Sequence, residues 1–131
     1  MNRRTLAFWV VTIPVGLAFL LSGIANLAHL PHIARDMTHL GYPPYFSTIL
    51  GTWKVLGALV LVLPGLRRAK EWAYAGMMFD LTGAAVSRGV MGDGAVGVIP
   101  PLVVASLVLA SWALREAHAN AAGQRKLCIA P

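Results

Sequence analysis

The sequence contains little cysteine and little charge, and each shortage excludes a class of protein. Its single cysteine, Cys128, lies in a polar tail, which excludes a disulfide framework, a CxxC dithiol and a cysteine metal cluster. We also find no cofactor fingerprint, no nucleophile and base paired on one helix, and no ligand set for haem or an iron–sulfur cluster. The sequence therefore offers no catalytic residue and no metal site, which argues against an enzyme that acts alone.

The shortage of charge indicates a membrane protein. Only 12% of the 131 residues are charged and 57% are apolar, and the mean hydropathy is +0.67. This composition has too little polar surface to cover a soluble globule of that size. A net charge of +6 is often a sign of nucleic-acid binding, but here the basic residues gather in short segments between apolar runs. We therefore expect the lipid bilayer, and no nucleic acid, as a partner.

Four apolar runs predict an all-α, membrane-spanning four-helix bundle, because each is long enough to cross a bilayer. Pro64-Gly65 separates the second run from the third, and Pro100-Pro101 falls in the first turn of the fourth helix, where proline costs least. The linker 32–45 is predicted to be a loop or a short interfacial helix. The predicted helices are at about 6–30, 46–63, 71–87 and 98–114, within a domain 1–114, and a polar cytoplasmic tail, 115–131, extends the last helix to about Gly123.

The basic residues predict the orientation of the chain. Most of the 11 Lys and Arg residues lie at the amino terminus, in the turn 66–71 and in the tail, whereas Arg35 and Arg88 lie in the other two loops. Because loops rich in Lys and Arg stay in the cytoplasm, we expect both termini to be cytoplasmic. The sequence thus predicts a multi-pass protein of the inner (cytoplasmic) membrane.

Two charged residues, Lys54 and Asp80, lie inside the second and third apolar runs. Each is about 12 Å from the start of its helix at about 1.5 Å per residue, so both fall near the middle of the bilayer. A lone charge there costs about 2.5–3.5 kcal/mol, and we therefore predict that they pair. Two interpretations stay open: the pair fixes the register of the helices, or it forms the polar end of a ligand pocket.

Other residues around the pair support a packed polar core. Helical spacing places Gly51 and Gly57 beside Lys54, and Gly76 and Gly83 beside Asp80, which is typical of membrane helices that approach closely. On the first helix Ser22, Asn26 and His29 share one face, and with Lys54 and Asp80 they are candidates to line one outward-open cavity. Trp53, beside Lys54, either walls that cavity or faces lipid.

The segment HLGYPPYFSTILGTWKVLGALVLVLPGLRRAKEWAYAGMMFDLTGAAVSRGVMGDG resembles the DoxX-like family of small four-helix membrane proteins. The likeness covers about 40–94 and is weaker in the first and last helices. Similar proteins often have histidine after the serine at position 87, where this chain has Arg88. The matching positions are Gly41, Tyr42, Pro43, Gly51, Lys54, Gly57, Pro64, Gly65, Lys70, Glu71, Trp72, Ala73, Tyr74, Gly76, Asp80, Gly83, Ser87, Gly92 and Asp93.

The resemblance implies two kinds of function. The family is named after a subunit of an archaeal thiosulfate:quinone oxidoreductase, other relatives are linked to membrane redox complexes that handle thiol stress, and a distant animal branch assists the assembly of nicotinic receptors. The first hypothesis is an accessory subunit that holds a quinone-like molecule around Lys54 and Asp80. The second is an assembly factor or scaffold in which the pair only fixes the fold. A second copy of the chain and another membrane protein both remain open as partners.

Overall fold

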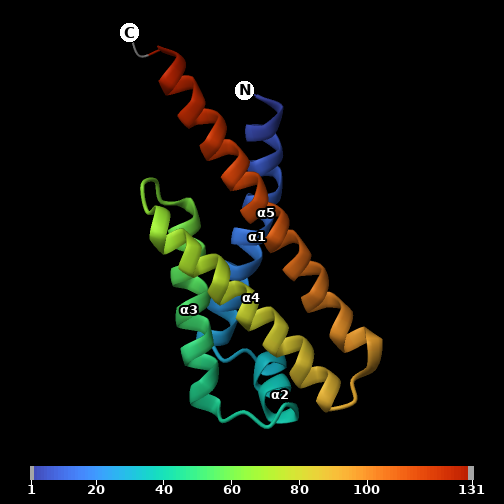
Figure 1. Cartoon of the computed structure of the whole chain (residues 1–131). Helices are drawn as coiled ribbons and strands as arrows, with labels where there is room; N and C mark the ends of the chain where they lie inside the picture. Colours follow the sequence, from blue (N-terminus) through green and yellow to red (C-terminus); the bar gives the residue numbers. More distant parts are fainter. Residues whose placement is uncertain (1, 130–131) are drawn as a thin grey trace.

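The computed structural model describes residues 2–129, except for the side chains at positions 118, 121, 122 and 125. Five helices cover nearly all of this range and no strand occurs in it (Figure 1), so the predicted all-α class is confirmed. The helices are α1 (Arg3–Leu27), α2 (Pro31–His39), α3 (Pro44–Val62), α4 (Arg67–Val90) and α5 (Gly94–Ile129).

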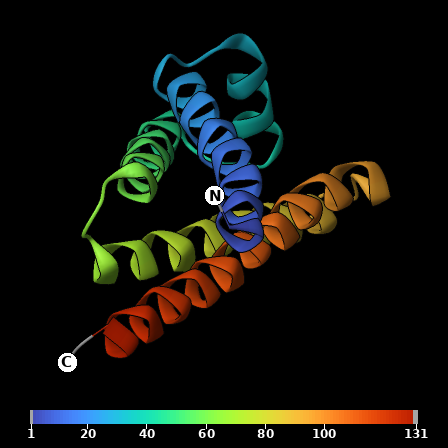
Figure 2. The same ribbon diagram turned by 90° about the horizontal axis from the view of Figure 1, so that it is seen from above.

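The four long helices pack as two close pairs, α1 with α3 and α4 with α5, which Figure 2 shows from above. The pairs meet where α1 touches α5 and where α3 touches α4, and the α3–α4 seam is the looser one. Apolar side chains of all four helices fill the centre, among them Phe19, Leu61, Met77 and Val108. Both termini and the α3–α4 turn lie at one end of the molecule, the terminal end, and α2 lies at the other, the α2 end (Figure 1).

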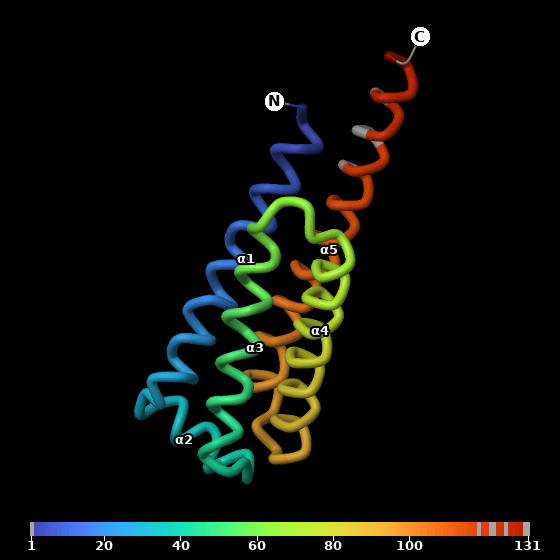
Figure 3. The backbone as a smooth tube through the Cα atoms, turned by 90° about the vertical axis from the view of Figure 1, so that its left-hand side faces the viewer, coloured from blue at the N-terminus to red at the C-terminus, as the bar shows by residue number. Residues whose placement is uncertain are grey.

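In the described part of the chain, three helices are long and apolar enough to cross a membrane: α1, α3 and the part of α5 from Gly94 to Ala117. This finding supports an integral membrane protein. Helix α4 has 24 residues, but charged residues near both ends and Asp80 in the middle make it much more polar than the other three. It nevertheless lies along α3 and α5, as Figure 3 shows.

Some helix boundaries differ from the predicted ones. Helix α1 ends at Leu27, because His29 adopts a left-handed conformation (φ 50°) that turns the chain before Pro31 opens α2. The linker thus contains a short helix, one of the two predicted alternatives. Helix α4 begins at Arg67, inside the basic segment.

The last helix differs most from the prediction. It begins at Gly94, so that Pro100 and Pro101 lie in its second turn instead of its first. It then continues through the alanine-rich tail to Ile129, because alanine, glutamate and arginine are strong helix formers. The tail extends beyond the other helices (Figure 3).

Candidate functional site

The loose seam between α3 and α4 contains a cavity of about 590 Å³, which we call the α3–α4 groove. Helix α3 lines it from Leu50 to Val60, helix α4 lines it from Ala69 to Asp80, and Phe19 of α1 contributes a third wall. Most of these side chains are aliphatic, aromatic or small. The groove is therefore apolar along most of its length, and the length that α3 contributes is about 15 Å at ~1.5 Å per residue.

Lys54 and Asp80 both line this groove. The Nζ atom of Lys54 lies 3.5 Å from Oδ2 of Asp80, and the two side chains are 16% and 19% exposed. Lys54 also donates a hydrogen bond of 3.3 Å to the hydroxyl of Ser22 on α1. The pair is thus partly exposed to the groove instead of sealed in the interior, and Lys54 joins three helices.

A second cavity, of about 160 Å³, lies against the same ion pair. Its walls include Ser22 of α1, Leu81 of α4 and Val104 of α5, and it shares Phe19, Lys54 and Asp80 with the larger groove. The ion pair therefore lies between two cavities. This arrangement leaves room beside both charged groups for a ligand atom or for water.

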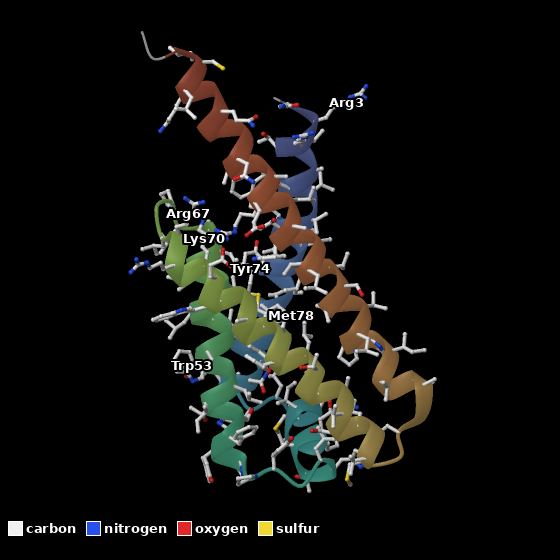
Figure 4. All side chains as sticks on the ribbon, viewed as in Figure 1. Arg3, Trp53, Arg67, Lys70, Tyr74 and Met78 are labelled. Carbon is white, nitrogen blue, oxygen red and sulfur yellow. The ribbon has the colours of Figure 1, made fainter. Side chains whose placement is uncertain are left out.

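Three large aromatic side chains stand at the groove and are mostly exposed. Trp53 is 70% exposed, Trp72 80% and Phe79 79%. Trp53 directly precedes Lys54 and Phe79 directly precedes Asp80, so each charged residue has an exposed aromatic neighbour in the chain. Figure 4 shows Trp53 projecting away from the other helices. Trp53 therefore lines the groove and is also exposed on the surface of the molecule.

The polar residues of α1 contact α3, but at different levels. Ser22 reaches Lys54, whereas Asn26 is bonded to Ser47: the Ser47 hydroxyl donates to the Asn26 carbonyl oxygen at 3.0 Å and to its side-chain oxygen at 3.1 Å. His29 lies beyond the end of α1 and bonds to Thr48 at 3.0 Å. Of these three residues only Ser22 lines a described cavity, so the structure does not bring Asn26 and His29 to the ion pair.

The four glycines near the pair have different surroundings. A Cβ at Gly51 would lie 2.7 Å from the carbonyl oxygen of Gly23 on α1, so Gly51 permits a close contact with α1. A Cβ at Gly57 would meet only the end of the Met77 side chain, at 3.5 Å, and at Gly76 or Gly83 it would meet nothing within 4 Å. The close approach thus lies between α1 and α3, and Gly76 helps to keep the α3–α4 groove open.

Two polar clusters were not foreseen from the sequence. At the α2 end, Arg88 contacts Asp36 at 2.9 Å and Asp93 at 3.5 Å, and Asp93 also binds His39 at 2.6 Å. The sequence separates these residues too widely to link them. Arg88 joins the two carboxylates, and among the described residues no group of three or more His, Cys, Asp or Glu is placed to hold a metal ion.

The other cluster lies nearer the terminal end. The hydroxyl of Ser111 on α5 is 2.7 Å from those of Thr12 on α1 and Tyr74 on α4. Next to it, Arg115 forms an ion pair with Glu71, which also accepts a hydrogen bond of 2.9 Å from the indole of Trp112. These contacts fasten α5 to α4 and α1. Tyr74 and Ser111 are single polar residues on apolar faces, a pattern too common in sequences to predict such a cluster.

Comparison with known proteins identifies a family. No curated protein and no solved structure matches the chain. The profile of the DoxX-like family matches residues 10–111. This range includes the ion pair, the α3–α4 groove, the smaller cavity beside the pair, all of α3 and α4, most of α1 and the first half of α5. The chain therefore belongs to the DoxX-like family.

Proposed function

We propose that the protein is a non-catalytic binding or accessory subunit that holds a small lipophilic molecule, such as a quinone, in the α3–α4 groove. The observation that carries this proposal is the combination of an apolar groove with one ion pair in its wall. Ligand sites are typically apolar with a few polar groups that orient the ligand. Lys54 would donate a hydrogen bond to a ligand carbonyl, and Asp80 would keep the lysine charged and oriented.

The rim of the groove suits a flat ring. Trp53 and Phe79 offer exposed aromatic faces on either side of the seam, next to the two charged residues. A planar head group would gain stacking contacts there, at centroid separations of about 4.5–7 Å, while its apolar chain stays among the aliphatic residues. A place in a membrane redox complex follows from this ligand class.

We further propose that α4 is a fourth span and that the terminal end faces the cytoplasm. The basic residues at the start of α1, at the start of α4 and in α5 all lie toward the terminal end (Figures 1 and 4), as loops rich in Lys and Arg do on the cytoplasmic side. Pairing with Lys54 offsets part of the cost of Asp80 in the membrane. This topology is that of a multi-pass inner-membrane protein.

An assembly factor or scaffold is the alternative function. It is favoured by the contacts of Lys54, which joins α1, α3 and α4 and would fix their register without any ligand. In that case the exposed apolar faces would engage a partner membrane protein or a second copy of the chain.

Native mass spectrometry of the protein, extracted in mild detergent from its own membranes, separates these functions. The binding proposal expects an adduct with the mass of an isoprenoid quinone or another defined lipophilic molecule. The double variant Lys54→Met with Asp80→Leu should remain folded yet lose that adduct. A clean spectrum of the unmodified chain, with a stable dimer or a copurified protein, would leave the scaffold function as the better account.

A further inference from the structure

A second groove lies between α4 and α5 and shares no lining residue with the α3–α4 groove. It has a volume of about 230 Å³, and its walls include Ala75 and Met78 of α4 and Leu109 and Trp112 of α5. Glu71 lines the end nearest the terminal end. From Glu71 to Met78 the groove follows α4 for about 10 Å at ~1.5 Å per residue, which is about two thirds of the hydrocarbon depth of one leaflet, ~15 Å.

Three cationic residues lie near this end of the groove. Arg115 of α5 forms an ion pair with Glu71, Lys70 lies near Arg115, and Arg67 lies one turn before Glu71 on the same face of α4. Figure 4 shows Arg67, Lys70, Tyr74 and Met78 in succession along α4. Glu71 is already engaged by Arg115 and by the Trp112 indole. Among the described residues Arg67 and Lys70 form no ion pair, so the cluster has an excess of positive charge next to an apolar groove.

Two further observations favour an anionic ligand at this cluster. The Nε atom of Arg115 is buried and donates no hydrogen bond to any described residue. Arg115 also lies close enough to Lys70 for the two positive charges to repel each other. An anionic oxygen between the two cations would accept hydrogen bonds from both and reduce this repulsion.

We propose that the α4–α5 groove binds one anionic phospholipid from the leaflet at the terminal end. The phosphate lies among Arg67, Lys70 and Arg115, and one acyl chain runs along the groove past Met78. Trp112 lines this groove. In the proposed complex its indole lies at the boundary between head groups and hydrocarbon, where tryptophan is enriched in membrane proteins. This site is independent of the proposed quinone-like ligand, which would lie on the other side of α4.

Arg3 of α1 provides a control of the same charge at the same end of the molecule. Figure 4 shows it on the other side of α5 from Arg67 and Lys70, and α1 contributes no residue to the α4–α5 groove. General attraction of a basic surface to anionic lipid would use Arg3 as much as Arg67, whereas a built site would not.

Quenching of Trp112 by brominated lipids tests the proposal. Trp9, Trp53 and Trp72 are replaced by Phe, which their exposed positions permit, and the full-length chain is placed in bilayers of phosphatidylcholine mixed with phosphatidylglycerol, with bromine on the chains of one or the other. We expect stronger quenching by the phosphatidylglycerol. Lys70→Gln or Arg67→Gln should weaken this preference about fivefold, the equivalent of ~1 kcal/mol per cation, and Lys70→Arg should retain it.

Arg3→Gln should leave the preference unchanged. Equal quenching by the two brominated lipids would overturn the proposal, and so would an equal loss in Arg3→Gln and Lys70→Gln. Circular dichroism of each variant shows whether the helices are retained, so that a folding defect is not taken for lost binding. None of these results depends on whether the α3–α4 groove is occupied.

Discussion

The backbones of Gly23 and Gly51 face each other where α1 and α3 approach most closely. A Cβ on Gly51 would lie 2.7 Å from the carbonyl oxygen of Gly23, and a Cβ on Gly23 would lie 3.0 Å from the carbonyl oxygen of Gly51. Neither position has room for a side chain: at Gly51 the nearest obstacle is backbone, and at Gly23 the Cγ2 atom of Val55, at 2.9 Å, is nearer still. This contact sets the spacing of the helix pair from which Ser22 and Lys54 project toward each other.

Gly51→Ala should therefore separate α1 from α3 and destabilise the protein. We expect a loss of about 1–3 kcal/mol, as for other overpacked interiors, measured by chemical unfolding in bicelles. Gly57→Ala is the control on the same helix, because its Cβ would make only an ordinary contact of 3.5 Å with the flexible Met77 side chain. Equal stability of the two variants would show that the helices can adjust to a methyl group at position 51.

Gly76→Leu should block the α3–α4 groove without disturbing the fold. A Cβ at Gly76 meets no atom within 4 Å and points toward space that the groove provides. We expect binding of a short-chain quinone, used as a probe, to weaken about tenfold or more, which corresponds to ~1.4 kcal/mol. Equilibrium dialysis in detergent would measure it.

Gly83→Leu is the matched control for that variant. Gly83 also lies on α4 with open space around it, but it does not line the groove. Both substitutions raise the helix propensity of α4 by a similar amount, about 0.8–1 kcal/mol. If Gly83→Leu weakened quinone binding as strongly as Gly76→Leu, the groove would not be the site.

Removal of only one member of the ion pair should cost more stability than removal of both. Lys54→Met leaves Asp80 without its cation, and a lone charge in a membrane costs about 2.5–3.5 kcal/mol. We expect that variant to lose about 2 kcal/mol, because the pair is partly exposed, and Lys54→Met with Asp80→Leu to recover most of the loss. A double-mutant cycle of unfolding free energies measures the coupling, and additive losses would contradict a pair that acts as a unit.

Arg88→Gln should loosen α2 from the rest of the molecule. The substitution removes the contacts of Arg88 with Asp36 and Asp93, each worth up to about 1 kcal/mol at this partly exposed site. We expect amide hydrogen exchange in Pro31–His39 to rise about fivefold.

Arg35→Gln is the control for α2, since among the described residues the Arg35 guanidinium bonds only to the carbonyl oxygen of Pro31 in its own helix. Faster exchange of α2 in that variant, to the same degree, would mean that the loss of any cation on this surface is enough. The Arg88 contacts would then have no special role in holding α2.

The sequence predicted the features that depend on composition and local spacing. The apolar runs gave the long helices, and the isolation of Lys54 and Asp80 in those runs led to the expectation that they meet. It did not predict which helix faces which glycine. Gly51 packs against α1 and not against α4, because the contact depends on Gly23, a residue 28 positions earlier in the chain.

Two other differences between the prediction and the structure have causes that the local sequence pattern does not contain. The cluster around Arg88 depends on the fold, which brings Asp36 of α2 to the end of α4. The contact between these two residues could not be predicted from their spacing in the chain. The helical tail was underestimated because membrane-helix prediction follows hydropathy, whereas the continuation of α5 depends on the propensity of alanine-rich polar sequence.

The polarity of α4 has a consequence for biosynthesis. In the proposed four-span topology, α3 is made before α4, and Lys54 then has the Ser22 hydroxyl but not its carboxylate partner, Asp80. Helix α4 is too polar to qualify as a span on its own composition, but it carries Asp80. In that topology the ion pair would couple the insertion of α4 to α3. A nascent chain released after α3 would therefore expose Lys54 without its partner Asp80. Membrane quality control would recognise such an unpaired charge as a defect.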